Sequence, residues 1–243
     1  MQNLRGRVAV VTGTTSGIGR AIATQFVQAG VHVYGVARRD LTTDDLVGSS
    51  PEGDVGTYTH IVGDVVQPDT ARNAIGRALA ERGAVDILVN NAGAGEYSDF
   101  LDSDVAFYDE MMGVNMRSTY LFTREVVPSM IDRSRGLILQ VASQAGLRGF
   151  AREAVYCASK HAQVGFTRAL RLELAPHGIK VAVLCPAAVK TDFARGRGRP
   201  YEKMGDAEFL TADDIADAVL FVAGQNPGAR ASEISLIALG ESL

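Results

Sequence analysis

Residues 7–19 read RVAVVTGTTSGIG. The first six, Arg7–Thr12, are an apolar, β-branched run typical of a strand buried on both faces. A glycine-rich turn, Gly13–Gly19, follows at once, and a helical pattern then runs over Arg20–Ala29 and ends at Gly30. Such a turn lets the backbone approach a pyrophosphate, which binds at the positive N-terminus of the helix. The stretch therefore predicts dinucleotide binding, although glycine-rich turns also occur for packing alone.

The rest of the chain alternates between apolar strand-like runs and segments with helical periodicity. Strands joined by helices form a parallel sheet with right-handed crossovers. We predict an α/β fold, a single domain over residues 1–243 with a Rossmann-type, doubly wound sheet of seven parallel strands and helices on both faces. The other predicted strands are Val31–Ala37, Tyr58–Gly63, Val85–Val89, Gly136–Ala142, Ile179–Cys185 and Glu233–Leu239, and the other helices are Asp69–Arg82, Asp102–Met112, Val114–Ile131, Ala154–Pro176 and Asp213–Ala223.

Two segments fit neither pattern. Residues 42–57 are polar with glycine, serine and proline, so at most one short helix is expected there. Residues 194–209 are charged and glycine-rich, and we interpret them as the mobile part of a substrate flap at about residues 187–210.

Composition excludes several classes of function. The 243 residues are 47% apolar with a net charge of −4, which suits one large domain and gives no reason to expect nucleic acid or an anionic membrane as partner. No apolar run reaches the ~18 residues of a membrane span, and residues 1–7 lack the apolar region of a signal peptide. Cys157 and Cys185 fit a reducing compartment, and no Cys/His cluster indicates a metal. We expect a cytoplasmic protein.

Tyr156 and Lys160 are four residues apart on a predicted helix, so they share one face. An isolated phenol has a pKa near ~10, and a fixed ammonium one turn away lowers this pKa by favouring the phenolate. The pair suits proton transfer at neutral pH. The alternative is a core tyrosine beside a solvated lysine.

The carboxyl ends of the predicted strands carry further candidates. Ser143 lies at the end of the fifth strand, where ligands bind in open α/β sheets. Asp64 follows the third strand and suits a hydrogen bond to the adenine amino group, or else it is a turn or capping aspartate. Asn115 lies near the start of a predicted helix, where an asparagine is usually a cap or exposed.

Taken together, these motifs resemble the short-chain dehydrogenase/reductase family over essentially the whole chain. Thr12-Gly13-x-x-x-Gly17-x-Gly19 is similar to the family's cofactor turn, and Asn90-Asn91-Ala92-Gly93 to its sheet-stabilising motif. Asn115, Ser143, Tyr156 and Lys160 match its catalytic tetrad. Two features depart from the family pattern: Pro186-Ala187 replaces the usual Pro-Gly, and the C-terminus lacks the common strand followed by Asp-Gly-Gly. The resemblance and the strand ends give candidate cofactor contacts at Gly13, Thr15, Ser16, Gly17, Ile18, Gly19, Arg38, Arg39, Asp64, Val65, Asn91, Ala92, Gly93, Tyr156, Lys160, Pro186, Val189 and Thr191.

The resemblance implies an oxidoreductase that interconverts a ketone and a secondary alcohol by hydride transfer. Tyr156 then acts as general acid or base, and Ser143 orients the carbonyl oxygen. Lys160 lowers the tyrosine pKa and binds the nicotinamide ribose, and Asn115 holds a water beside it. The Val189 backbone and Thr191 hold the carboxamide. Two other classes stay open, namely a lyase, epimerase or dehalogenase on the same fold and a regulator that binds a dinucleotide without turnover.

The end of the second predicted strand favours NADP(H) over NAD(H). An NAD site usually places an acid there to bind both ribose hydroxyls, whereas this chain has Arg38 and Arg39 and no carboxylate until Asp40. A guanidinium suits a 2′-phosphate. Against this, Ser16 stands where some NADP-preferring relatives have a basic residue, and arginines beside a strand are often only solvated.

The substrate is defined only as a small carbonyl or alcohol compound. We expect the arginines around the pocket and flap either to meet a substrate carboxylate or simply to be solvated; they are Arg148, Arg152, Arg195, Arg197 and Arg199. The expected pocket residues are Ala94, Gly95, Glu96, Tyr97, Gln144, Ala145, Phe150, Arg152, Ala187, Ala188 and Phe193.

The predicted helix Ala154–Pro176 also carries a stripe of small residues at spacings of three and four. Such a stripe packs closely against the protein's own sheet or against a partner. With the resemblance, it favours a homo-tetramer, with a dimer as the next possibility. The stripe consists of Ala154, Ala158, Ala162, Gly165 and Ala169.

Overall fold

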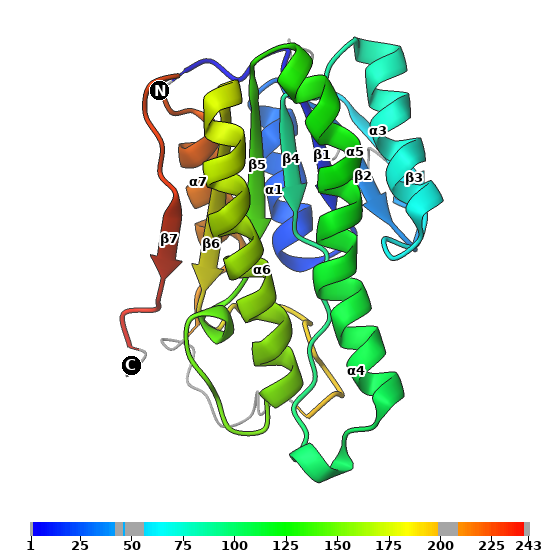
Figure 1. The fold of residues 1–243 in the computed structure, drawn as a ribbon, viewed down its shortest axis with the longest axis vertical. Coiled ribbons are helices and arrows are strands. Elements are labelled where there is room, and N and C mark those ends of the chain that lie inside the picture. Colours follow the sequence, from blue (N-terminus) through cyan, green and yellow to red (C-terminus); the bar gives the residue numbers. More distant parts are fainter. Residues whose placement is uncertain (1, 42–45, 47–55, 199–208, 241–243) are drawn as a thin grey trace.

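The computed structural model describes residues 2–41, 46, 56–198 and 209–240. Its strands form one parallel sheet in the order β3-β2-β1-β4-β5-β6-β7 (Figure 1). This order confirms the predicted doubly wound fold, in which the order of successive strands reverses beside β1. The strands are β1 (Val8–Thr12), β2 (His32–Ala37), β3 (Tyr58–Val62), β4 (Ile87–Asn90), β5 (Gly136–Val141), β6 (Ile179–Pro186) and β7 (Glu233–Leu236).

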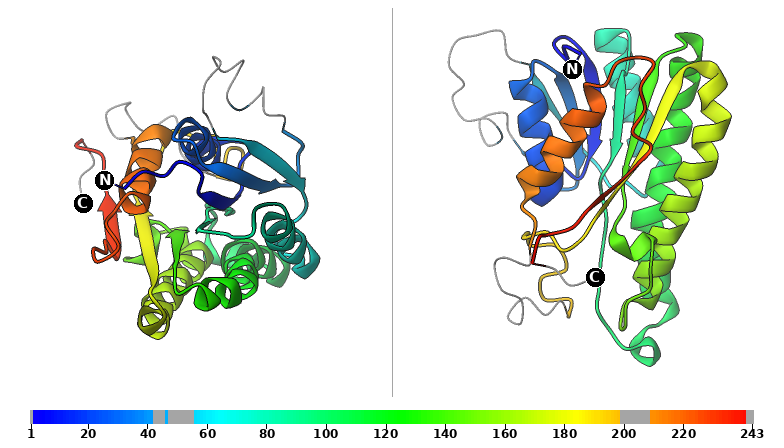
Figure 2. Two further views of the ribbon diagram at one scale, coloured as in Figure 1. Left: turned by 90° about the horizontal axis from the view of Figure 1, so that it is seen from above. Right: turned by 90° about the vertical axis from the view of Figure 1, so that its left-hand side faces the viewer.

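Helices cover both faces of the sheet (Figure 2). In β1, Ala9 and Val11 belong to the core on one face, whereas Val8 and Val10 belong to the core on the other. Alternate side chains of a strand point to opposite faces, so a continuous apolar run is what a two-sided core requires. The first face is covered by α1 (Gly17–Gln28) and α7 (Ala212–Ala223), and the second by α3 (Pro68–Arg82), α5 (Ser118–Asp132) and α6 (Ala154–Leu174).

The predicted break between two helices near Gly113 is wrong. Instead, α4 (Val105–Met112) continues into α5 through one π turn, Gly113–Arg117. A π turn inserts one extra residue into a helix and often marks a functional site. Here it contains the buried Asn115.

Other boundaries differ by smaller amounts. Helix α1 begins at Gly17, three residues before the predicted start, and Ser16 is its N-cap residue. Strand β7 ends at Leu236 rather than Leu239, whose side chain is fully exposed. Three short helical turns complete the described chain: η1 (Phe100–Asp102), η3 (Gln144–Gly146) and η4 (Ala175–His177).

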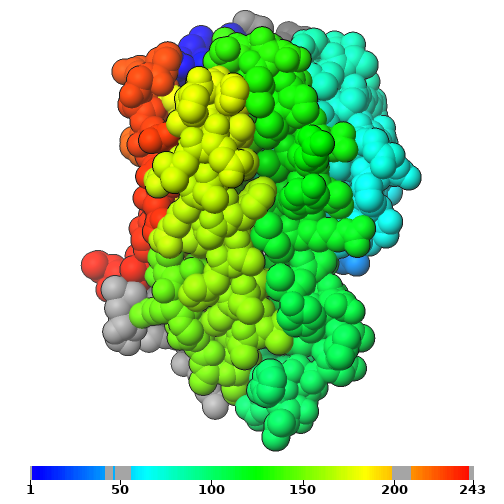
Figure 3. Space-filling model, in the orientation of Figure 1, coloured from blue at the N-terminus to red at the C-terminus, as the bar shows by residue number. Residues whose placement is uncertain are grey.

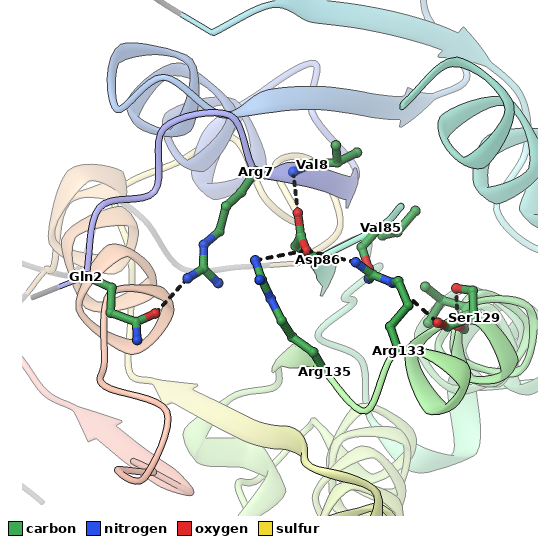
Figure 4. A network of polar contacts seen from close by, with 9 residues as sticks. Gln2, Arg7, Val8, Val85, Asp86, Ser129, Arg133 and Arg135 are labelled. Atoms are coloured by element: carbon green, nitrogen blue, oxygen red, sulfur yellow. Dashed lines mark hydrogen bonds and ion pairs between the residues drawn. The ribbon is translucent and has the colours of Figure 1, made fainter. Parts of the chain in front are cut away.

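An ion-pair network around Asp86 links elements at the amino ends of the strands (Figure 4). The buried carboxylate of Asp86 accepts a hydrogen bond from the Val8 N–H at 3.0 Å and pairs with Arg133 at 3.2 Å and Arg135 at 3.4 Å. Arg133 also donates to the carbonyl of Val85 at 2.7 Å. One carboxylate therefore joins the start of β1, the residue before β4 and the end of α5.

Parts of two predicted segments lie outside the described residues, namely 42–45 and 47–55 of the polar segment and 199–208 of the flap. Among the helices that the structure describes, none has both the length and the apolar character needed to cross a bilayer. In the same residues, no group of three or more His, Cys, Asp or Glu side chains is arranged to hold a metal ion.

Candidate active site

A cleft of about 1140 Å³ opens at the carboxyl ends of the strands. Every predicted cofactor contact lines it, from Gly13 in the glycine turn to Thr191 in the flap. Ser143 and Tyr156 line the same cleft. The parallel sheet explains this convergence, because it brings the carboxyl ends of all strands to one edge.

The glycine turn has room only for glycine at its key positions. Gly13 and Gly17 adopt positive φ angles of 76° and 52°, a region that other residues rarely occupy. A Cβ on Gly19 would lie 2.1 Å from the Gly13 carbonyl oxygen. The first turn of α1 contains no acidic residue, so its free N–H groups and positive end remain suited to a pyrophosphate.

Residues of β3 and of the segment after β4 hold this turn in place. Asn91, after β4, donates to the Thr12 carbonyl at 2.8 Å, while the Thr12 hydroxyl accepts from the N–H groups of Asn91 at 3.0 Å and Ala92 at 2.9 Å. Thr14 bonds the Tyr58 hydroxyl at 2.8 Å, which also bonds His60 at 2.8 Å. Burial raises the pKa of Tyr58 to about 12, which extends the pH range over which its hydroxyl keeps a proton for these bonds.

At the end of β2, the arginines line the cleft and the nearest acid does not. Arg38 and Arg39 line the cleft, and Arg39 donates to the Thr15 hydroxyl at 3.4 Å. Asp40 is not part of the lining, and its carboxylate accepts from the Leu41 N–H at 2.9 Å. Among the described residues, this corner of the cleft therefore presents guanidinium groups.

Asp64 has the turn role considered for it, and it also lies in the cleft. Its carboxylate accepts from the N–H of Val66 at 3.2 Å, which fixes the turn after β3. Asp64 and Val65 also line the cleft, and the free oxygen positions of the carboxylate remain suited to an amino group.

Tyr156 and Lys160 stand one turn apart on the buried side of α6. Their side chains are 7% and 3% exposed, and the Lys160 ammonium lies 5.7 Å from the centre of the Tyr156 ring. Burial lowers the pKa of Lys160 to about 8, with the Cys185 thiol acting in the opposite direction. Lys160 Nζ also donates to the Val141 carbonyl at 3.4 Å. The structure therefore excludes a solvated lysine at this position.

Ser143 is positioned by the turn that follows β5. Its hydroxyl oxygen accepts a hydrogen bond from the N–H of Ala145 at 3.1 Å, and its backbone is extended. The hydroxyl proton remains available for donation into the cleft. This arrangement suits a group that holds a developing negative charge on a substrate oxygen.

Asn115 lies behind the cleft rather than in its lining, and it is completely buried. Its side chain exchanges two hydrogen bonds with the backbone of Ala94, at 2.8 and 3.0 Å, and donates to the Ser159 hydroxyl at 2.8 Å. Its main-chain carbonyl accepts from Thr119 at 2.8 Å and Gln163 at 2.7 Å. Asn115 thus joins the π turn to the strand end and to α6.

The substrate end of the cleft is lined by small and aromatic residues. The Phe193 ring lies 6.0 Å from the Tyr156 ring and so close to Gly95 that a Cβ there would approach it to 2.4 Å. Of the expected pocket residues, Glu96 and Arg152 are not in the lining. The others are, namely Ala94, Gly95, Tyr97, Gln144, Ala145, Phe150, Ala187, Ala188 and Phe193.

Several residues that support the site were not identified from the sequence. Gln163 and Thr167 continue the spacing of Tyr156 and Lys160 along α6, and all four are buried. The spacing of four, three and four residues places these side chains on one helix face, so it could have predicted that Gln163 is buried beside Lys160. Glu110 had no such signal, because only tertiary packing places it beside Arg197 of the flap.

These residues fit a nicotinamide dinucleotide. The glycine turn leaves open the space that a Cβ would fill, the N-terminus of α1 faces it, and Arg38 and Asp64 lie where an adenosine moiety would end. Lys160 and Thr191 lie farther along the same cleft, toward Tyr156. Held this way, the group would place its reactive end beside the tyrosine.

Comparisons with known proteins agree with this geometry. A sequence model of the family described as short chain dehydrogenase matches residues 7–202. D-beta-hydroxybutyrate dehydrogenase of Rhizobium meliloti (strain 1021) is 31% identical over 242 residues, covering 90% of this chain and 92% of the relative. A metagenomic short-chain oxidoreductase solved in complex with NADP has a TM-score of 0.79 at 30% identity, covering 97% of this chain and 98% of that one. The alcohol dehydrogenase of the archaeon Thermococcus sibiricus, complexed with 5-hydroxy-NADP, has a TM-score of 0.84 at 26% identity, covering 98% of both chains.

Proposed function

The chain belongs to the short-chain dehydrogenase/reductase family, and we propose that it is an NADP(H)-dependent oxidoreductase that interconverts a ketone and a secondary alcohol. The observation that carries this proposal is that Tyr156, Lys160 and Ser143 line the same cleft as the glycine turn. A proton donor, a cation and a hydroxyl group therefore face the space where a dinucleotide fits.

The residues divide the work in the following way. When bound, NADP(H) supplies or accepts the hydride. In reduction, Tyr156 gives its proton to the substrate oxygen, and in oxidation its phenolate removes that proton. The Ser143 hydroxyl donates to the same oxygen and stabilises its negative charge. The Lys160 ammonium favours the phenolate and binds the nicotinamide ribose hydroxyls.

Asn115 is proposed to hold a water between itself and Lys160. Both side chains approach Gly93, because a Cβ there would lie 3.3 Å from Asn115 Oδ1 and 3.5 Å from Lys160 Nζ. A glycine at this position leaves the space between the two polar groups open. The bonds of Asn115 to Ala94 and Ser159 support a second role, which is to fix the π turn.

The preference for NADP(H) over NAD(H) rests on the end of β2. Arg38 and Arg39 face the cleft, and Asp40 is directed to the backbone of Leu41. A guanidinium binds a phosphate through several N–H donors, whereas a carboxylate in the cleft would repel it. At the other end, Pro186, the Val189 backbone and Thr191 are proposed to hold the nicotinamide carboxamide.

A screen of the purified protein tests this function. The protein is mixed with a panel of ketones and secondary alcohols and with each of the four nicotinamide cofactors, and cofactor absorbance is followed. We expect absorbance changes with NADPH or NADP⁺ and at least one panel member. Substrate conversion without any absorbance change would instead favour a lyase, epimerase or dehalogenase. Cofactor binding without any turnover would favour a regulator.

A homo-tetramer is the proposed assembly, with a dimer as the next possibility. The small-residue stripe lies on the outer side of α6, where Ala154, Ala158 and Gly165 are exposed, so it does not pack against the protein's own sheet. Figure 3 shows this helix on the surface beside α4 and α5. Phe100 and Leu101, which precede α4, are 70% and 94% exposed. Light scattering that gives a monomer mass at micromolar concentration would contradict this assembly.

The proposed location is the cytoplasm. Cys157 and Cys185 are both free and buried, as expected for a protein of a reducing compartment.

A further inference from the structure

Arg197 is the described arginine at the substrate end of the cleft, and two carboxylates already bind it. Its guanidinium donates to both carboxylate oxygens of Glu110, at 3.0 and 2.9 Å, and pairs with Glu96 at 2.8 Å. These bonds raise the pKa of Arg197, chiefly through Glu110. The Arg197 carbonyl also accepts from the N–H of Tyr97 at 2.9 Å, which fixes this part of the flap against the loop after β4. Arg197 is thus already paired with two negative charges.

The other described arginines that were candidates for binding a carboxylate make their contacts outside the cleft. Arg152 pairs with Asp99 at 3.4 Å, and Arg195 pairs with Asp192 at 2.7 Å. The guanidinium of Arg148 lies over the Phe150 ring, 4.8 Å from its centre. None of these three lines the cleft.

Among the described residues, carboxylates outnumber cations along the lining at this end. Asp109, Glu110, Glu153 and Asp192 line the cleft here, against two cations, Arg197 of the described flap and Lys160 beside Tyr156. The other lining arginines belong to the adenosine end: Arg38 and Arg39 follow β2, and Arg117 lies one turn beyond Gly113, which faces Val66 after β3. Like charges repel more strongly in a cleft with low-dielectric walls than in open water.

From this distribution we propose that the substrate is a ketone or secondary alcohol without an anionic group, and that an apolar part of it packs against Phe150 and Phe193. The inference rests on the proposed function. Family membership does not supply it, because the Rhizobium relative is named for hydroxybutyrate, which is a carboxylate.

Ligand pairs that differ only in charge test the proposal. We choose 4-oxopentanoate, its methyl ester and its amide, together with the same three forms of a benzoyl-substituted keto acid. Calorimetry with the NADP⁺-loaded protein measures binding, and NADPH oxidation measures kcat/KM. We expect the ester and amide of at least one frame to exceed the acid about tenfold or more in both measurements. An acid that equals its amide, or no binding by any neutral member, would overturn the proposal.

A double variant, Glu96→Gln with Glu110→Gln, frees Arg197 and removes a carboxylate from the lining. We expect the acid-to-amide ratio of affinity to rise about tenfold. Glu153→Gln leaves the Arg197 contacts intact and should shift the ratio in the same direction by less, which covers the case in which the double variant folds poorly. The control, Glu173→Gln with Asp217→Asn, removes two exposed carboxylates outside the cleft and should leave the ratio unchanged. An unchanged ratio in both cleft variants would refute the charge argument.

The readouts separate this inference from the proposed function. Binding of neutral ligands without NADPH oxidation would contradict the oxidoreductase function and leave the charge selectivity standing. Oxidation of NADPH with acid and amide at equal kcat/KM would do the reverse.

Discussion

Asn115 bridges both polar groups of the Ala94 backbone, since its Oδ1 accepts from the N–H at 2.8 Å and its Nδ2 donates to the carbonyl at 3.0 Å. Asn115 has no exposed surface. The segment after β4 and the π turn are therefore held together by direct hydrogen bonds.

Asn115→Leu keeps the size of the side chain but removes the bridge and the bond to Ser159. The half-buried N–H of Ala94 and the buried Ser159 hydroxyl then lose their bonds to Asn115, so we expect the free energy of unfolding to fall by about 2–3 kcal/mol in urea denaturation. Asn73→Leu, at an exposed position on α3, is the control and should change it by no more than about 0.5 kcal/mol. Equal losses in the two variants would contradict the bridging role.

Tyr156→Phe retains the ring and deletes only the hydroxyl. Because that hydroxyl is the proposed proton donor, we expect kcat to fall roughly 10²-fold or more while the dissociation constant for NADPH stays near that of the wild type. Tyr120→Phe removes an exposed hydroxyl from α5 and should leave kcat unchanged. Near-normal turnover by Tyr156→Phe would remove Tyr156 from the mechanism.

Arg38→Asp reverses the charge at the end of β2. We expect NADPH affinity to fall and kcat/KM with NADH to rise, since a carboxylate repels a 2′-phosphate and accepts the ribose hydroxyls. Arg124→Asp makes the same change on the exposed surface of α5 and controls for net charge. If the wild type already uses NADH as well as NADPH, Arg38 is not a phosphate ligand.

The buried ammonium of Lys160 makes stability depend on pH. Its pKa is about 8 in the folded protein, against 10.5 when unperturbed, because burial disfavours the charged form. Between these values the unfolded chain binds more protons than the folded one, so this group makes the free energy of unfolding rise with pH. This rise in the free energy of unfolding begins at about pH 7 and is complete at about pH 11.

Lys160→Met isolates that contribution. We expect the stability difference, wild type minus variant, to increase as pH rises from 8 to 10.5. Cys185, whose pKa burial raises to about 11, acts in the opposite direction but is present in both proteins. A difference that stays constant over this range would show that Lys160 is not desolvated.

Asp86→Asn removes the charge that pairs with Arg133 and Arg135. We expect a loss of about 2–3 kcal/mol in the free energy of unfolding, because the carboxylate is buried and hydrogen-bonded. Asp69→Asn breaks a pair with Arg72 whose side chains are 87% and 59% exposed, and it should cost about 0–1 kcal/mol. If both variants lose the same amount, burial does not set the value of the Asp86 network.

Local signals were enough to predict the sheet, the glycine turn and the relative position of Tyr156 and Lys160. An apolar run such as Arg7–Thr12 is buried wherever it lies in a parallel sheet, and Gly19 is required by the Gly13 carbonyl within the same turn. Tyr156 and Lys160 share a helix, so their relative position follows from spacing alone.

What depends on tertiary packing could not be predicted. The π turn at Asn115 is stabilised by Gln163 from another helix, and nothing in the local pattern around Gly113 indicates it. The partners of Arg197 likewise come from α4 and from the loop after β4. Sequence alone therefore left that arginine open as a ligand for a substrate carboxylate.

The residues that stabilise the fold at the amino ends of the strands are far from the residues that line the cleft at the carboxyl ends. Substrate selectivity and folding stability are therefore thermodynamically separable. Asp86 lies at the amino ends of the strands and the cleft at their carboxyl ends, and strands of about five residues at ~3.3 Å each place them well over 10 Å apart. Free-energy changes at sites this far apart usually add. Combining Asp86→Asn with the Glu96/Glu110 double variant should give the sum of their separate effects. Substitutions in the cleft that change the substrate can therefore be combined with stabilising substitutions at the amino ends of the strands, and each set can be chosen independently.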